Sequence, residues 1–147
     1  MKFIKFLIII FISISSPIKA DSNLNLINEL KEGGNLIFIR HAYAPGSGDP
    51  KYFDINDCKT QRNLSNIGRD QSKKIGSFFK DNNIPIDRIY SSEWCRCKET
   101  ADIAFREFST NSFLNSFYSS KYAKNKDKQI KALNNYVKKL TGNKNLI

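Results

Sequence analysis

Two arginines and the only histidine follow the two apolar runs that read as buried strands. Arg40 and His41 come directly after residues 36–39, and Arg96 lies shortly after residues 86–90. Ligands of open parallel sheets bind beyond the carboxyl ends of the strands, so these side chains are expected at one edge. Arginine grips phosphate through two parallel hydrogen bonds. A histidine whose other ring nitrogen is held by a backbone carbonyl can attack phosphorus. The pattern therefore predicts a site for phosphoryl transfer.

The same residue types also have ordinary structural uses. His41 could be a capped loop histidine, and Arg40 and Arg96 could form surface salt bridges. Residue type alone does not separate these roles from catalysis. The sequence that flanks these residues is needed to distinguish a catalytic role from a structural one.

The elements that must position these residues alternate along the chain. Apolar periodicity predicts helices over residues 23–31, 67–80, 95–108 and 126–140, with Ser65 as an N-cap. Strands are predicted over 36–39, which should be buried on both faces, and over 86–90. The segments 44–60 and 111–123 are turn-rich and irregular. This order predicts an α/β layered domain with a mostly parallel sheet flanked by helices.

The last residues, Asn145 to Ile147, resemble the opening of a third strand. A strand that has only begun would leave an unfinished edge in the sheet. We therefore expect the domain to be incomplete at its C-terminus.

The first twenty residues have the layout of a secretory signal peptide. Lys2 and Lys5 precede a nine-residue apolar run, Phe6 to Ile14, and Ala20 offers a small residue at the cleavage point. A membrane anchor is the alternative, but spanning takes about 20 apolar residues. The sequence thus predicts a signal peptide over 1–20 and a partial domain over 21–147. The mature protein would be periplasmic or secreted, without stable membrane insertion.

Composition and charge bound the remaining functions. The 147 residues are 40% hydrophobic, enough for one domain with a core, and they carry a formal charge of +10. A basic surface attracts anions in general. No zinc-finger spacing, aromatic RNA-binding signature or G-x-x-G loop accompanies the charge, so nucleic acid is not expected as a partner. No pattern sets the oligomeric state.

Export would allow the three cysteines to form disulfides. Cys95 and Cys97 are too close in sequence for an unstrained mutual bond, so Cys58 is expected to pair with one of them. All three could instead be small buried hydrophobes. One histidine and no second cysteine pair fall short of a zinc site, so no metal or other cofactor is expected.

Three ordered motifs resemble those of one family. They are Leu36-Ile37-Phe38-Ile39-Arg40-His41-Ala42, Leu64-Ser65-Asn66-Ile67-Gly68-Arg69-Asp70-Gln71, and the segment from Tyr90 to Ala101, which has a Ser-x-x-x-Arg-x-x-x-Thr-Ala pattern. Together they resemble the histidine phosphatase superfamily, also called phosphoglycerate mutase-like. The resemblance covers residues 35–108, and the last predicted helix also fits.

The resemblance implies roles for individual residues. His41 would be the nucleophile that becomes phosphohistidine, and Arg40 and Arg96 would hold the phosphoryl oxygens. Arg62 ends the 44–60 loop region and would either reach the pocket or form a loop salt bridge. Cys58 and Cys95 flank the same region, so a disulfide between them would brace the loop.

The sequence departs from the family pattern in two places. The family carries a second histidine just after a third strand, and here the chain ends before that turn. The general acid also has no clear match, because the nearest equivalent of an Asn-Glu pair is Asn115-Ser116. The acids that could replace it are Asp49, Asp54, Asp57 and Glu107.

Two functions are compatible with these residues. The first is a phosphomonoester hydrolase that acts on a small phosphorylated substrate through a phosphohistidine on His41. The alternative is a non-catalytic relative that binds phosphate or another anion but lacks the second catalytic histidine.

Overall fold

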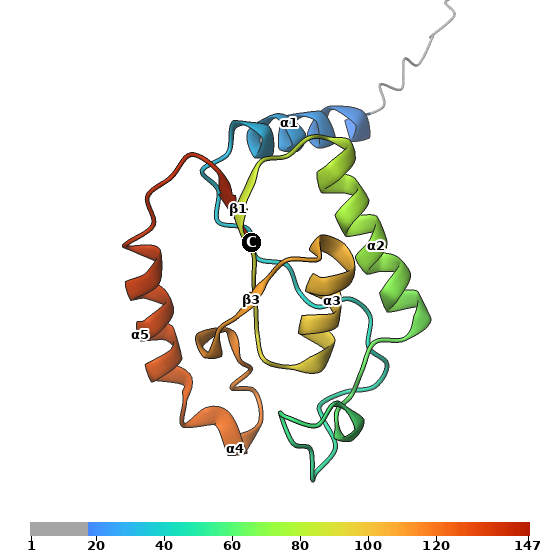
Figure 1. Cartoon of the computed structure of the whole chain (residues 1–147), viewed down its shortest axis with the longest axis vertical. Helices are drawn as coiled ribbons and strands as arrows, with labels where there is room; N and C mark the ends of the chain where they lie inside the picture. The colour runs from blue at the N-terminus through green and yellow to red at the C-terminus, as the bar shows by residue number, and fades with distance from the viewer. Residues whose placement is uncertain (1–17) are drawn as a thin grey trace, which may run out of the picture.

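The computed structural model describes residues 18–147, in which helices lie on both sides of short parallel strands (Figure 1). The longer helices are α1 (Ile18–Glu32), α2 (Asn66–Asp81), α3 (Cys95–Phe105) and α5 (Lys126–Val137), with shorter η1 (Cys58–Thr60), η2 (Ser112–Leu114) and α4 (Ser120–Ala123). The strands are β1 (Ile86–Arg88), β2 (Tyr90–Ser91), β3 (Ser109–Thr110) and β4 (Asn145–Leu146). The predicted α/β class is confirmed.

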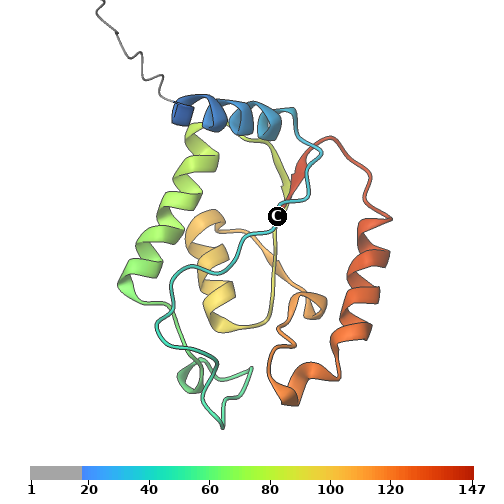
Figure 2. The same cartoon turned by 180° about the vertical axis from the view of Figure 1, so that it is seen from behind.

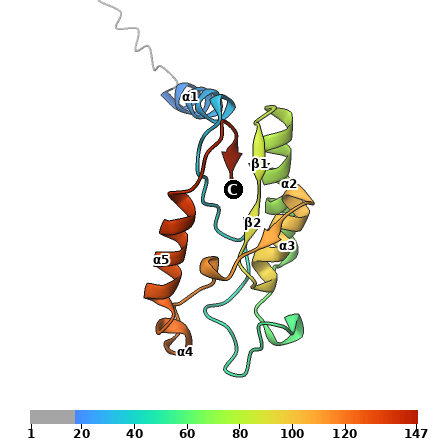
Figure 3. The ribbon, with the colours of Figure 1, turned by 60° about the vertical axis from the view of Figure 1, so that its left-hand side comes forward.

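The strands form an array of two small parallel sheets, and the C-terminal strand lies inside it. β4 pairs with β1, and Leu36 bridges to Leu146 on the other side of β4. The chain continues from β1 into β2, which pairs with β3. Viewed from the side, α5 covers one face of this array while α2 and α3 cover the other (Figure 3). The expected third strand at 145–147 is therefore present as β4.

The prediction that residues 36–39 form a strand buried on both faces is wrong. Only Leu36 forms a bridge, and Phe38 is 66% exposed. Ile37 and Ile39 face the other way and pack against the core cluster around Phe79. Side chains of an extended segment alternate between two faces, and here the side chains of Leu36 and Phe38 are exposed.

Two predicted boundaries also move. The run 86–90 is divided into β1, which pairs with β4, and β2, which pairs with β3. The third helix ends at Phe105 instead of residue 108, because Arg106 adopts a φ of 68°. This left-handed residue stops the helix and frees the next residues to form β3.

The last predicted helix is shorter than predicted, and its most buried residue lies outside the apolar stripe. α5 ends at Val137, Ile130 is 41% exposed, and Gln129 is buried instead. The Gln129 amide donates to the carbonyls of Ser112 and Asn115 at 2.8 and 3.1 Å. The backbone carbonyls of the irregular segment before α5 need hydrogen-bond donors. A polar residue, Gln129, therefore occupies the buried face of α5.

Asn145 ties the centre of the molecule together. Its side chain is fully buried, and its Oδ1 accepts hydrogen bonds from the backbone and side-chain amides of Asn35 at 3.1 and 2.9 Å. Its Nδ2 donates to the carbonyls of Leu30 and Pro85. One side chain thus joins the end of α1, the start of the His41-bearing segment and the start of β1. Figure 2 shows these segments meeting beside the C-terminus.

The predicted signal peptide, residues 1–20, falls largely outside the described residues. Its last three residues begin α1, which is longer than the predicted helix over 23–31. In the part of the chain that is described, no helix has both the length and the hydrophobicity required to cross a bilayer.

The 44–60 loop is fastened at its far end. Cys58 forms a disulfide with Cys95, the first residue of α3, while Cys97 is free. Beside the disulfide, the Gln61 Oε1 atom accepts a hydrogen bond from the backbone amide of Cys95 at 3.0 Å. These two contacts join the end of the loop to the first residue of α3.

Removing this disulfide should destabilise the protein measurably. The bond closes a loop of 37 residues, which constrains the unfolded chain by about 4 kcal/mol in the entropic account. The Cys58→Ser variant should lose about that much free energy of unfolding in urea. Cys97→Ser is the matched control and should lose much less. Peptide mapping that links Cys58 to Cys97 instead would contradict the assignment.

Candidate active site

His41 lies just past the bridge at Leu36, with one ring nitrogen fixed by the backbone. Its Nδ1 atom is 2.7 Å from the carbonyl oxygen of Ala42. A carbonyl only accepts, so Nδ1 carries the proton in this hydrogen bond and the lone pair of the neutral ring is on Nε2. This geometry leaves the Nε2 lone pair unengaged by that hydrogen bond.

The surroundings of His41 favour the neutral ring. Burial is the largest influence and lowers the pKa of His41 below 6.5, while the hydrogen bond to Ala42 raises it. The charges of Arg96, Arg62 and Arg40 lower the pKa further, with Arg96 contributing most among them. A neutral imidazole near pH 7 is the form that can act as a nucleophile.

The backbone around His41 is held from two helices. The amide of Ala42 donates to Thr100 Oγ1 on α3 at 3.0 Å, and the Thr100 hydroxyl donates to the carbonyl of Arg96. The amide of Tyr43 donates to Gln71 Oε1 on α2 at 2.8 Å. The Thr and Gln of the sequence motifs therefore fix the main chain next to His41.

The start of α2 approaches this backbone so closely that only glycine fits. A Cβ at Gly68 would lie 2.1 Å from the carbonyl oxygen of Tyr43. Ser65 caps the helix by accepting a hydrogen bond from the amide of Gly68 at 3.2 Å, as predicted, and its own amide donates to the Tyr43 carbonyl. The Leu-Ser-x-x-Gly-x-x-Gln motif is thus a backbone support for the His41 segment.

Arg96 is buried and paired with Asp49. Its Nη1 and Nη2 atoms donate to the two carboxylate oxygens of Asp49 at 2.6 and 3.1 Å. The Trp94 indole and the backbone amide of Arg62 donate to the same carboxylate at 3.0 and 3.3 Å. Burial raises the pKa of Asp49, but the hydrogen bonds from Arg96 and Trp94 outweigh it and hold that pKa below its usual value.

The other two arginines have different surroundings. Arg62 donates from Nε to the carbonyl of Gly48 at 2.7 Å and from Nη1 to the carbonyl of Ala44. It therefore fastens the 44–60 loop rather than pairing with an acid, while its charge still acts on His41. The side chain of Arg40 is exposed and forms no hydrogen bond with the described residues.

Three of the four acids considered as general acids lie in the 44–60 loop and accept hydrogen bonds, whereas Glu107 follows α3 and is exposed. Asp49 is held as a carboxylate by its pairing with Arg96, which makes it a poor proton donor. Asp54 and Asp57 accept hydrogen bonds from nearby loop amides. Asn115, the nearest match to the family's Asn-Glu pair, donates to the carboxylate of Glu93 and accepts from the Glu93 amide. The neighbouring carboxylate is thus supplied by a residue 22 positions earlier in the chain.

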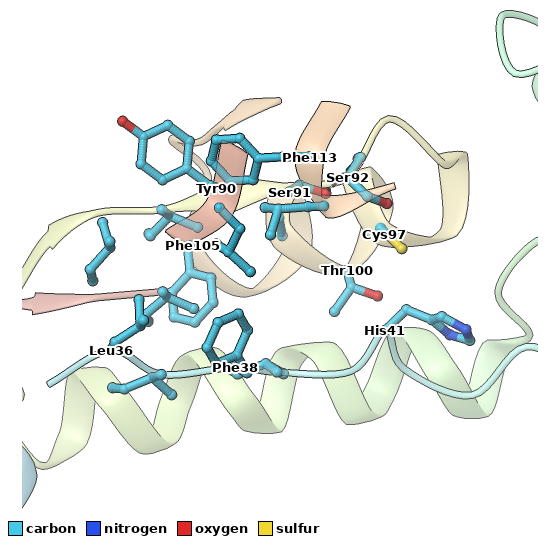
Figure 4. Close-up of a pocket in the computed structure, with 18 of the residues that line it drawn as sticks. Leu36, Phe38, His41, Tyr90, Ser91, Ser92, Cys97, Thr100, Phe105 and Phe113 are labelled. Atoms are coloured by element: carbon cyan, nitrogen blue, oxygen red, sulfur yellow. Dashed lines mark hydrogen bonds between the residues drawn. The ribbon is translucent and has the colours of Figure 1, made fainter. Parts of the chain in front are cut away.

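An apolar cleft begins at His41 (Figure 4). His41, Thr100, Cys97 and Ser92 form its polar end, and the Cys97 thiol is buried there, which raises its pKa. The rest of the wall is apolar or aromatic and includes Leu36, Phe38, Tyr90, Phe105 and Phe113. Its volume is about 160 Å³. Arg40 and Arg96 are not among its lining residues. Within residues 18–147, no cluster of three His, Cys, Asp or Glu side chains could hold a metal ion.

Sequence reasoning missed the role of Asp49. It lies between Gly48 and Pro50 in a loop without periodicity, 47 residues before its partner Arg96. Its only signal was that of an acid in a long loop near the predicted site.

Comparison with known proteins gives the same family as the motifs. Residues 36–115 match the histidine phosphatase superfamily, branch 1. Relatives include the mitochondrial serine/threonine-protein phosphatase Pgam5 of Drosophila willistoni, 32% identical over 80 residues, which cover 54% of this chain and 25% of the relative. The Pgam5 of Drosophila grimshawi is 31% identical over 77 residues, 52% of this chain and 24% of the relative.

The chain spans about a quarter of the length of these curated relatives. No solved structure matches it at a comparable level of significance. The family match covers more than half of the chain and includes His41, Arg62 and Arg96, together with the residues that hold their backbone. The chain belongs to the histidine phosphatase superfamily, branch 1.

Proposed function

We propose that the protein is a phosphomonoester hydrolase that works through a phosphohistidine on His41. The observation that carries the proposal is the hydrogen bond of His41 Nδ1 to the carbonyl of Ala42, which leaves Nε2 free. The lowered pKa of His41 and the three arginine charges that act on it support the same role. So does membership of a family named for histidine phosphatases.

The proposed reaction has two steps. Nε2 attacks phosphorus, the P–N bond forms, and the ester P–O bond breaks as the leaving oxygen takes a proton from an acid or from water. Water then attacks phosphorus, the P–N bond breaks, and inorganic phosphate leaves, while the electron pair returns to Nε2. The arginine charges stabilise the negative charge on the transferring group in both steps.

We propose that full activity requires a second histidine. The family resemblance places it directly after the strand that is β4 here, and the 147 residues contain only His41. Losing one aimed donor commonly costs about 10²–10³ in rate. The 147 residues alone should therefore bind phosphate and turn over phosphomonoesters slowly.

The chemistry of the site supports a proposal for the substrate class. A small phosphomonoester is one candidate, and the Pgam5 relatives, named as serine/threonine-protein phosphatases, suggest phosphoserine and phosphothreonine in proteins as a second class. An aryl phosphate and a phosphoserine peptide, assayed side by side, distinguish the two.

We also propose that the protein is exported and cleaved near Ala20, which makes it periplasmic or secreted. The signal-like pattern of residues 1–20 motivates this proposal. The Cys58–Cys95 disulfide supports it, because disulfides persist in oxidising compartments.

The pKa of His41 can be measured directly, because the chain has no other histidine. Folding lowers this pKa, so the NMR titration midpoint of the ring should lie below 6.5 in the folded protein. The same chain in urea is the control and should titrate near the ordinary value of about 6.5. Because the pKa of His41 is lower in the folded state, protonation of this ring decreases the free energy of unfolding as the pH falls through the folded pKa. A folded midpoint at or above 6.5 would contradict the described surroundings of His41.

Replacing the nucleophile should abolish turnover. In a chain that continues from β4 into a second histidine, His41→Ala should lower hydrolysis of an aryl phosphate by at least about 10³-fold. The variant should also lose the acid-labile phosphoenzyme trapped from wild-type protein. Asn134→Ala, on the exposed side of α5, should leave both readouts unchanged. A wild-type chain that binds phosphate but never forms phosphoenzyme would favour the non-catalytic alternative.

Export is tested by N-terminal sequencing of protein recovered outside the cytosol. The expected sequence begins near Asp21. Recovery of a chain that begins at Met1 would overturn cleavage.

A further inference from the structure

The guanidinium of Arg96 uses only part of its hydrogen-bonding capacity. It carries five N–H groups arranged in fixed directions. Asp49 takes one from Nη1 and one from Nη2, which together form the end edge of the group. The side edge, formed by Nε–H and the second Nη2–H, lies at an angle to this pair and remains for another acceptor.

The Nε atom of Arg96 is buried and has no hydrogen-bond partner among the described residues. The side chain as a whole is only 8% exposed. Buried donors without a partner are rare in native proteins, and those that occur require a physical explanation. A charged donor of this kind is suited to an anion that binds there.

We propose that Asp49 is a positioning residue, which holds the end edge of Arg96 so that the side edge binds the phosphoryl oxygens of the substrate. The inference rests on the proposed function and assigns Asp49 a role in the same site. Asp49 itself would not touch the substrate.

The contacts of Asp49 show why phosphate should not displace it. Its carboxylate accepts from Arg96 twice, from the Trp94 indole and from the Arg62 amide, and it is 11% exposed. Leaving this position would remove the partners of the Trp94 N–H and the Arg62 N–H at once. The removal of one member of a buried ion pair is costly because the other charge stays behind.

The position of Arg96 links this arrangement to His41. The carbonyl of Arg96 accepts from the Thr100 hydroxyl, which in turn accepts from the amide of Ala42 beside the nucleophile. Asp49 fixes the head of Arg96 while Thr100 ties its backbone to the His41 segment. The guanidinium and the backbone of Arg96 are therefore both positioned relative to Nε2 of His41.

The test measures binding of inorganic orthophosphate to the protein and to four variants. Asp49→Asn keeps the size of the side chain but cannot accept at both positions, so it should weaken binding by about tenfold or more. Asp49→Glu retains the carboxylate and should recover part of the affinity. Trp94→Phe removes one donor to Asp49 and should weaken binding several-fold. Asp87→Asn changes an exposed carboxylate that pairs with Arg88 and should have no effect.

A spectroscopic readout separates positioning from general stability. In wild-type protein, the NMR signal of the Arg96 Nε–H should shift downfield when phosphate is added, because this donor gains an acceptor. In Asp49→Asn the shift should be lost while the far-UV circular dichroism stays that of a folded protein. Should that variant unfold, Trp94→Phe and Asp49→Glu carry the comparison.

Four results would overturn the inference. Tighter phosphate binding by Asp49→Asn would mean that Asp49 occupies the phosphate position. Unchanged binding in Asp49→Asn, or an Arg96 Nε–H signal indifferent to phosphate, would mean that the pair does not position the site. Absence of phosphate binding by the wild-type protein would overturn the proposed function as well, which distinguishes the two failures.

Discussion

The arrangement of the site depends on the short backbone stretch from His41 to Tyr43. The Ala42 carbonyl holds the imidazole, and the amides of Ala42 and Tyr43 donate to side chains of two helices. Thr100 of α3 and Gln71 of α2 approach this stretch from different helices. The imidazole orientation is therefore only as precise as the packing of α2 against α3, which is tight enough that a Cβ at Gly76 would lie 2.2 Å from the Ala104 carbonyl.

The sequence predicted correctly those features that depend on residues close together in the chain. Ser65 was predicted to cap α2 because its side chain serves the next turn of the same helix. The α/β class followed from the alternation of apolar periods. The prediction of a strand buried on both faces at 36–39 was wrong. An apolar run shows that a segment is hydrophobic, but not whether both of its faces are packed, and Phe38 lines the open cleft.

The features that sequence could not predict depend on partners far along the chain. Asp49 meets Arg96 across 47 residues, and Asn145 meets Asn35 across 110. The sequence around Asp49 and the sequence around Asn145 contain no pattern that indicates a distant partner. Gln129 shows the same limit, because its burial answers the needs of carbonyls at Ser112 and Asn115 rather than the periodicity of its own helix.

The free thiol of Cys97 governs how the protein behaves once it unfolds. In the folded state, burial keeps this thiol protonated and unreactive, although it lies two residues from one end of the disulfide. Unfolding removes that protection, so the thiolate forms more readily and can attack the sulfur of Cys58 or Cys95. Heating at alkaline pH should thus lead to scrambled chains that do not refold, whereas unfolding in acid stays reversible. The working life of the protein in a warm, mildly alkaline medium is then set by the rate of its first opening and not by its equilibrium stability.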